Sequence, residues 1–380
     1  FGTGRSPNPG GSDGRDDAGQ HMNYSFYGDH IDRFGWFADG LKAAFERNGH
    51  LWVDEPEEAA LVVNFFEPDR PRPFRRKAQA VFLISVTDSA ELLDHAIYSA
   101  YPSLVRSLAN LLITLVDEGG REPTAHFLTP EQGHYTVSGD LPIEEYFDRV
   151  YGRIHPLATS QLVINNVYRT DLPEGLWDGD EVTRSIHEAG RRLDSLDLLP
   201  TPFPMHDVLP ERDIKHIRRL YGLGGLSYGN ISARKDETTF WMSASGVDKS
   251  NLQEVGRDIL LVQDYDPEEN AMILSVPPEI EPRRVSVDAI EHWMIYREHP
   301  EVGAIIHVHA WMDGIPATEF NYPCGTYELG VAVADIIREA PDPGKAVVGL
   351  KNHGVTITGE SLEEIFERTG GKLIQPVPMS

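Results

Sequence analysis

The sequence predicts an α/β protein of two domains, and three observations support this. Near-continuous apolar runs of strand length, such as residues 59–66 and 80–86, alternate with helical patterns, as in sheets covered on both faces. A chain of 380 residues is too long for one typical core. Residues 198–204 hold three prolines, as linkers often do. We therefore expect one domain over residues 22–199 and another over residues 205–380.

The first of these domains is predicted to be Rossmann-like, with three layers. Apolar residues at helical spacing predict a helix over residues 37–48. Further helices are predicted over residues 96–117 and 143–151, and a strand over residues 161–168. The domain has neither a GxGxxG nor a Walker A loop, and its histidines are scattered, so its role is not predicted. These histidines are His95, His126, His134 and His155.

In the second domain a helix is predicted to open at Pro210 and to end before the glycines of residues 222–225. Apolar strand-like segments follow, each ending in a polar motif. The last predicted helix spans residues 362–368. A sheet flanked by helices is expected here as well.

Composition narrows the partners and the location. The formal net charge of −26 argues against nucleic acid, because phosphate backbones require clustered Lys and Arg. No apolar run approaches the roughly 18 residues of a membrane helix. The single cysteine, Cys324, excludes internal disulfides and a Cys-rich zinc site. Residues 1–21 are expected to be a disordered extension without a signal peptide, so a cytoplasmic location is expected.

The strongest local feature is a His-x-His motif. The apolar residues 304–306 lead directly into His307 and His309. Residues i and i+2 of a strand share a face about 7 Å apart, so both imidazoles can reach one ion. A catalytic zinc site uses three protein ligands and an open position.

A second apolar run, residues 347–350, ends in Asn352-His353-Gly354. The glycine permits a tight turn beside the histidine. His353 is then predicted to be the third ligand of a divalent metal, most simply Zn²⁺.

A third motif opens the helix that precedes the His-x-His strand. Ser286 suits a helix N-cap, and Asp288 in the first turn complements the helix dipole. The functional alternative is that Ser286 binds phosphate and that Asp288 faces the metal as a catalytic carboxylate. His292 lies one turn further on the same face and is a possible pocket residue.

Two polar turns with glycine complete the set. Asn230 belongs to Gly-Asn-Ile-Ser-Ala-Arg, whereas Ser245 and Gly246 belong to Ser-Ala-Ser-Gly-Val. Small residues let backbone N–H groups approach an anion closely, although either segment alone is more often an ordinary turn.

These motifs, in this order, resemble the class II aldolase/adducin family, which includes fuculose-phosphate aldolase and ribulose-5-phosphate 4-epimerase. The resemblance covers about residues 205–372 and includes Gly325-Thr326-Tyr327-Glu328-Leu329, which is similar to the family's GTxEL helix start. It implies a central β-sheet flanked by helices, in a homo-oligomer that is usually a tetramer. It also implies a metal held by His307, His309 and His353, and Asp288 as acid/base. The implied phosphate-binding positions are Asn230, Ser245, Gly246 and Ser286.

The resemblance implies a metal-dependent lyase, of aldolase or decarboxylase type, that acts through an enediolate on a phosphorylated or acidic sugar derivative. An epimerase on the same scaffold is the alternative that aspartate at position 288 favours. A non-enzymatic, adducin-like interaction module is a further alternative, in which the metal ligands would be lost.

The sequence departs from the family pattern at two places. Val287 replaces the second serine of the Ser-Ser-(Glu/Asp) motif, which puts the phosphate in doubt. Only fifteen residues, Ala310 to Cys324, separate His309 from Gly325. The pocket is therefore expected to be more open, or to be completed by another subunit or by the first domain.

Overall fold

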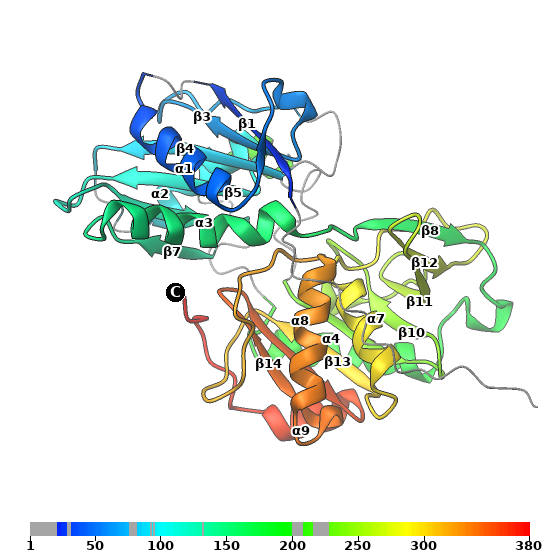
Figure 1. The fold of residues 1–380 in the computed structure, drawn as a ribbon. Coiled ribbons are helices and arrows are strands. Elements are labelled where there is room, and N and C mark those ends of the chain that lie inside the picture. The colour runs from blue at the N-terminus through cyan, green and yellow to red at the C-terminus, as the bar shows by residue number, and fades with distance from the viewer. Residues whose placement is uncertain are drawn as a thin grey trace, which may run out of the picture.

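The chain forms two lobes, each built on a mixed sheet with helices on both faces (Figure 1). The α/β class that the sequence predicts is thus confirmed. The structure is a computed structural model. It describes residues 21–28, 32–75, 82–91, 93, 96–130, 133–199, 208–215 and 228–380.

The first lobe holds a seven-stranded sheet in the order β2-β1-β3-β4-β5-β6-β7. The strands up to β5 run parallel, and β6 and β7 are antiparallel at the edge. Helices α1 and α3 cover one face and α2 covers the other. The order 2-1-3-4-5 is that of flavodoxin-like sheets rather than the Rossmann order. The elements are β1 Asn23–Gly28, α1 Gly35–Arg47, β2 Leu51–Trp52, β3 Leu61–Phe65, β4 Phe82–Ser89, α2 Ala96–Ser107, β5 Leu111–Val116, β6 Thr124–Leu128, β7 His134–Val137 and α3 Ile143–Thr159.

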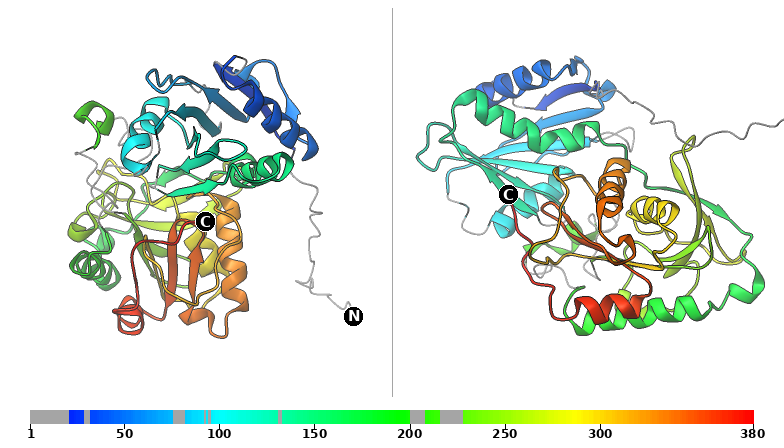
Figure 2. Two further views of the ribbon diagram at one scale, coloured as in Figure 1. Left: turned by 90° about the vertical axis from the view of Figure 1, so that its left-hand side faces the viewer. Right: turned by 60° about the horizontal axis from the view of Figure 1, so that its bottom comes forward.

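The second lobe holds an eight-stranded sheet in the order β14-β15-β13-β9-β10-β11-β12-β8. Helices α7 and α8 pack together on one face, whereas α4 and α9 lie on the other (Figure 2). The predicted central sheet flanked by helices is therefore present. The elements are β8 Asn165–Arg169, α4 Glu181–Ser195, β9 Asn230–Arg234, β10 Phe240–Ser243, β11 Ile259–Asp266, β12 Ala271–Ser275, α7 Ala289–Glu298, β13 Ala304–Val308, α8 Tyr327–Glu339, β14 Val347–Leu350, β15 Gly354–Gly359 and α9 Leu362–Thr369.

The change from one sheet to the other differs from the predicted boundary at residues 199 to 205. Strand β8 pairs with β12 in parallel, and α4 packs on β9 and β10. Residues 165–199 therefore belong to the second lobe, and the chain leaves the first sheet before β8. Leu209 and Ile214, by contrast, pack in the core beneath α2 of the first lobe. The proline segment did not mark the boundary, because the chain crosses between the lobes more than once.

One predicted helix, over residues 96–117, is wrong in its second half. Helix α2 ends at Ser107, and β5 follows as six consecutive buried residues between β4 and β6. Leu108 adopts a left-handed φ of 60°, and the side chain of Asn110 accepts a hydrogen bond from Leu83 N at 3.0 Å. A strand buried on both faces lacks the alternation that would distinguish it from a buried helix.

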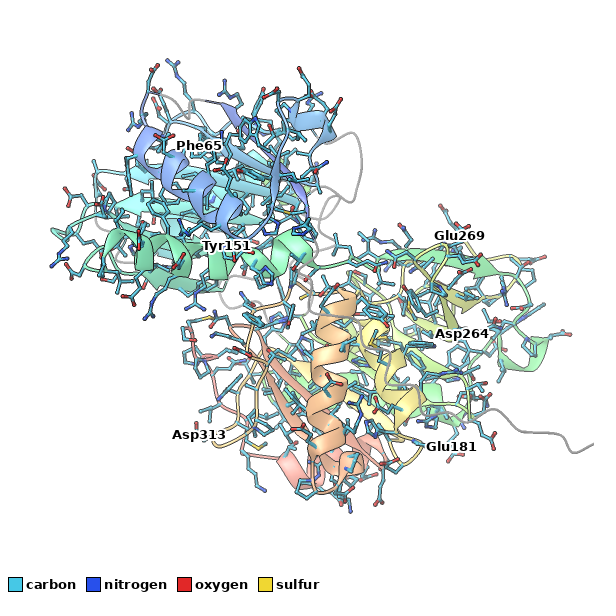
Figure 3. All side chains as sticks on the ribbon, in the orientation of Figure 1. Phe65, Tyr151, Glu181, Asp264, Glu269 and Asp313 are labelled. Carbon is cyan, nitrogen blue, oxygen red and sulfur yellow. The ribbon has the colours of Figure 1, made fainter. Side chains whose placement is uncertain are left out.

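Most other predicted helices and strands agree with the structure to within a few residues, except that α3 runs on to Thr159. The second half of the helix predicted from Pro210 lies outside the described residues. The predicted extension 1–21 lies almost wholly outside the described residues, as do most of the linker and the glycines 222–225. No helix in the described part is long and apolar enough to cross a membrane. Acidic residues spread over the surface of the second lobe, as Glu181, Glu269 and Asp313 illustrate (Figure 3).

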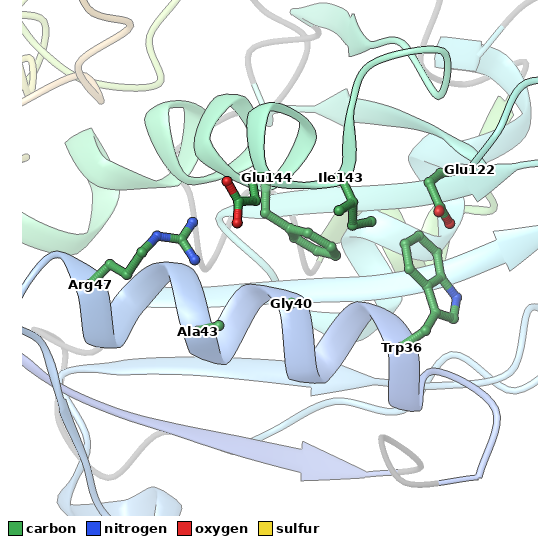
Figure 4. Close-up of a pocket in the computed structure, with 8 residues that line it drawn as sticks. Trp36, Gly40, Ala43, Arg47, Glu122, Ile143 and Glu144 are labelled. Carbon is green, nitrogen blue, oxygen red and sulfur yellow. The ribbon is translucent and has the colours of Figure 1, made fainter.

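A hollow of about 340 Å³ lies between α1 and α3 in the first lobe (Figure 4). Trp36, Ile143 and Phe147 give it an apolar wall, and Arg47 and Glu144 lie at one end. The chemical motifs of the sequence all lie in the second lobe, so the hollow is separate from them.

The packing of α4 on the second lobe can be tested at Gly190. A Cβ added there would lie 1.8 Å from the backbone oxygen of Lys249, so alanine must displace one of the two segments. We expect Gly190→Ala to lower the free energy of unfolding by about 1–3 kcal/mol, as overpacking does. The matched control is Gly152→Ala in α3, where a Cβ meets nothing within 4 Å and where alanine should stabilise by about 0.5–1 kcal/mol. Urea unfolding measures both, and equal effects would contradict the packing of α4.

Candidate active site

Three imidazoles converge at one end of the second sheet. His307 lies in β13, His309 follows the end of that strand, and His353 lies in the turn between β14 and β15. One ligand nitrogen of each lies within 4.8 Å of the others, and the Nε2 atoms of His309 and His353 are 3.1 Å apart. Two nitrogens that share a tetrahedral zinc ion are roughly 3.3 Å apart, given bonds of about 2.05 Å. The spacing therefore suits a common metal ion.

The surroundings keep these imidazoles neutral and orient one of them. His307 Nδ1 lies 3.0 Å from the backbone oxygen of Val355. A proton on Nδ1 makes this hydrogen bond and leaves the Nε2 lone pair, which is buried without a partner among the described residues. Burial lowers the pKa of His307 and lowers the pKa values of His309 and His353 well below the usual value. Neutral imidazole is the form that binds metals.

A row of side chains across three strands brings two carboxylates beside His307. Asn230, His307 and Thr356 are paired in register across β9, β13 and β15, so they share one face. Asn230 Nδ2 donates to Asp288 Oδ2 at 2.7 Å, and Thr356 Oγ1 donates to Glu291 Oε1 at 2.5 Å. Both carboxylates belong to the start of α7. The predicted site residue Asp288 thus lies next to the histidine cluster.

The start of α7 differs from the predicted helix cap. The helix begins at Ala289, so Asp288 rather than Ser286 occupies the N-cap position, and its side chain makes no capping hydrogen bond. Asp288 is 5% exposed, and its Oδ1 atom has no partner in the described part of the chain. A capping role therefore does not account for this buried carboxylate.

His292 lies in a buried chain of polar groups behind the cluster. Its Nδ1 is 2.7 Å from Ser232 Oγ, which is 2.9 Å from the hydroxyl of Tyr296. Burial, with a smaller effect from the nearby His307, lowers the pKa of His292 to about 3. His292 is accordingly a neutral residue buried behind the cluster, and its expected place in the substrate pocket stays a prediction.

The predicted anion-binding positions lie on three segments. Ala244 and Val285 form an antiparallel β-bridge, in which Ser245 N donates to the backbone oxygen of Arg284 and Ser286 N donates to that of Ser243. Gly246 is exposed with a left-handed φ of 69°. The amide of Asn230, by contrast, is used by Asp288. Ser245 and Ser286 therefore lie on opposite sides of this bridge.

Comparison with known proteins places this site in a family. The family model for the class II aldolase and adducin N-terminal domain matches residues 214–313. Methylthioribulose-1-phosphate dehydratases of two Klebsiella pneumoniae strains are each 32% identical over 38% of this chain and 79% of their own length. The chain belongs to the class II aldolase and adducin family.

Two solved structures are also similar to part of the chain. The YgbL protein of Klebsiella pneumoniae matches with 19% identity and a TM-score of 0.32, over 50% of this chain and 83% of its own. The YgbL protein of Escherichia coli matches with 14% identity and a TM-score of 0.30, over 51% and 92%. Of the histidine cluster, His307 and His309 lie within the matched family domain, and His353 lies beyond it.

Sequence reasoning missed two charged residues of this class II aldolase site. Glu291 is 1% exposed and Lys249 is 3% exposed. Burial lowers the pKa of Lys249 to about 8, while Asp288 and Asp248 oppose the shift. Lys249 follows an acidic residue in a polar turn, which usually indicates a solvated surface. The place of Lys249 near the site becomes apparent only from its burial in the folded lobe.

Two contacts bring the first lobe close to the histidine cluster. Asn321, within the short segment after His309, donates to the hydroxyl of Tyr135 at 3.2 Å. A Cβ on Gly133 would lie 3.2 Å from the backbone oxygen of Asn352, the neighbour of His353. The pocket was expected to be more open, or to be completed by another subunit or by the first domain. These contacts favour completion by the first domain.

Two further features near these segments were not foreseen. Cys324 Sγ lies 3.3 Å from His353 Nε2, just before the start of α8. In the first lobe, the histidines that seemed scattered include a hydrogen-bonded pair: His126 Nδ1 is 3.1 Å from His134 Nε2, and its Nε2 is 3.0 Å from Glu118. Neither could be read from spacing, because each depends on segments that meet only in the fold.

Proposed function

We propose that this protein is a metal-dependent lyase that acts through an enediolate on a phosphorylated or acidic sugar derivative. The observation that carries the proposal is the convergence of three neutral imidazoles beside a buried carboxylate, in a chain of the class II aldolase family.

In this proposal His307, His309 and His353 hold the divalent metal, with zinc as the expected ion. The orphaned Nε2 atom of His307 and the close ring nitrogens of the other two fit such an ion. When bound, the ion would act as a Lewis acid on a substrate carbonyl.

The remaining roles fall on the start of α7 and the neighbouring turns. Asp288 takes or returns the proton at the substrate carbon, because its Oδ1 atom has no partner among the described residues and it lies beside His307. Ser245, Gly246 and Ser286, at positions that the family resemblance implies, bind the anionic end of the substrate. Lys249 adds a positive charge near Asp288.

The type of lyase reaction is narrowed by the relatives. The curated relatives are dehydratases of a ketose phosphate, so we favour loss of water over carbon–carbon cleavage or decarboxylation. Aspartate at position 288 keeps an epimerase as the second candidate. An adducin-like interaction module is disfavoured because all three histidines remain.

We also propose that residues 22–160, with Leu209 and Ile214 packed onto them, form one structural unit and that residues 161–199 and 228–380 form the other. We further propose that the protein is a homo-oligomer in the cytoplasm. The tetramer expected from the family resemblance stays a prediction.

The test combines metal analysis with a substrate screen. The purified protein should contain about one zinc or other divalent ion per chain. Phosphorylated ketoses and sugar acids are then incubated with the protein, with and without chelator, and products are identified by mass. Loss of one water, abolished by chelator and restored by metal, is the expected result. A metal-free protein that turns over none of these compounds would contradict the proposal.

A further inference from the structure

Two histidine nitrogens also face each other in the first lobe. His126 lies in β6, and His134 in β7 is paired with Leu128, two positions from His126. Both imidazoles therefore project from one face of the sheet, close enough to meet diagonally. His126 Nδ1 is 3.1 Å from His134 Nε2, the same distance that separates the Nε2 atoms of His309 and His353. This spacing suits two ligands of one tetrahedral ion, which are roughly 3.3 Å apart.

A carboxylate fixes the orientation of one of these rings. His126 Nε2 lies 3.0 Å from Glu118 Oε1, so its proton is donated to the carboxylate and Nδ1 keeps its lone pair, on the side of His134. Metal-binding histidines almost always donate their second N–H group to a carboxylate, a carbonyl or a water. That bond fixes the tautomer and makes the ring a stronger ligand. Glu118 therefore has the place of the carboxylate that orients a metal-binding histidine.

The state of His134 suits metal binding as well. Burial, with a smaller effect from His126, lowers the pKa of His134, so its ring is neutral at pH 7. A neutral ring that carries its proton on Nδ1 presents the Nε2 lone pair. His126 is 7% exposed and His134 is half-buried, so an ion can reach the pair from the side of His134. The net charge of −26 favours the approach of a cation.

We propose that His126 and His134 bind a divalent transition-metal ion, with Glu118 orienting His126, in a metal site distinct from the histidine cluster of the second lobe. The two imidazole nitrogens hold the ion, and water fills its other positions. Imidazole ligands suit Zn²⁺, Cu²⁺ and Ni²⁺, whereas Mg²⁺ and Ca²⁺ prefer oxygen. With two protein ligands instead of three, the ion should exchange readily with free metal in solution.

The position of the pair suggests what a bound ion would do. Strands β6 and β7 form the hairpin at the edge of the first sheet, and the pair joins one strand to the other. The same hairpin approaches the second lobe, where a Cβ on Gly133 would lie 3.2 Å from the backbone oxygen of Asn352. An ion across the two strands would therefore brace the hairpin that contacts the turn of His353. We infer a structural or regulatory ion rather than a catalytic one.

The amount of zinc bound per chain tests the proposal. The purified protein is dialysed against increasing concentrations of buffered Zn²⁺, and bound zinc is measured by elemental analysis. Wild-type protein should bind about one ion more than His134→Gln. The control is His155→Gln in α3, which removes a histidine whose Nδ1 is 3.0 Å from the hydroxyl of Tyr151 and should leave the zinc count unchanged. Equal counts in wild type and His134→Gln would overturn the proposal.

His309→Ala separates this site from the proposed catalytic one. That variant should keep the ion on His126 and His134, so zinc should still raise its melting temperature. The double variant His309→Ala/His134→Gln should show no such rise, and a rise of equal size in both would overturn the proposal. If the lyase proposal fails because the three-histidine cluster binds no metal, the difference of about one ion between wild type and His134→Gln is still expected.

Glu118→Gln keeps both ligands and removes the carboxylate behind His126. Zinc affinity at this site should fall by about 10–100-fold, as it does when such a partner is lost. The side chain of Glu118 is 37% exposed, so the change should not disturb folding. This variant therefore tests the site even if His134→Gln fails to fold. An unchanged zinc affinity would contradict the role of the carboxylate and overturn the proposed arrangement.

Discussion

Replacing His309 by alanine is expected to yield a folded protein that no longer retains its metal ion. His309 is half-buried, so its removal creates little cavity, but it takes away one of three proposed ligands. Changes in the partners of metal ligands already cost about 10–100-fold in affinity, so loss of a ligand should cost at least about 100-fold. Turnover should fall to background. Elemental analysis after dialysis, together with a melting curve, measures both effects.

The control for this variant is His187→Ala. His187 lies in α4 on the other face of the sheet, where its Nδ1 is 2.6 Å from the backbone oxygen of Leu252. This change removes a histidine without touching the cluster, and the metal content should stay at the wild-type level. Full metal content in His309→Ala would remove the proposed site. Equal metal loss in both variants would point to general destabilisation instead.

Asp288→Asn is expected to lower turnover by roughly 10²–10⁴-fold with little change in melting temperature. The asparagine oxygen can still accept the hydrogen bond from Asn230, so the local shape is kept. What is lost is the transferable proton. The side chain makes no capping bond, so the helix should not weaken. Steady-state kinetics, metal content and melting are measured together, and wild-type turnover would exclude a catalytic role.

Asp180, an aspartate that does cap a helix, provides the complementary control. Asp180 caps α4 by accepting from Thr183 N, and it pairs with Lys235 at 2.8 Å. The Lys235 ammonium and these hydrogen bonds hold the pKa of Asp180 below its usual value, although burial alone would raise it. Asp180→Asn should therefore lower the melting temperature and leave turnover unchanged. Asp288→Asn should lower turnover but not the melting temperature, and Asp180→Asn should do the reverse. The same effect in both variants would contradict the distinction between a chemical and a structural role.

The metal motif could be predicted because its chemistry is local. His307 and His309 share a strand face by the period of two, and Gly354 marks the turn that brings His353 alongside. The start of α8 at Thr326 is just as local, since its side chain accepts from Leu329 N. Such features depend only on neighbours in the chain.

The tertiary structure alone decided everything that depends on distant segments. Leu111–Val116 became a strand because it is buried between two other strands, where no periodicity distinguishes the two possibilities. Strand β8 joined the second sheet through its register with β12. The buried Glu291 could not be foreseen either, because its hydrogen-bond partner Thr356 lies 65 positions away in the sequence. A charged residue in sequence is expected at the surface, and only burial by other elements turns it into part of a site.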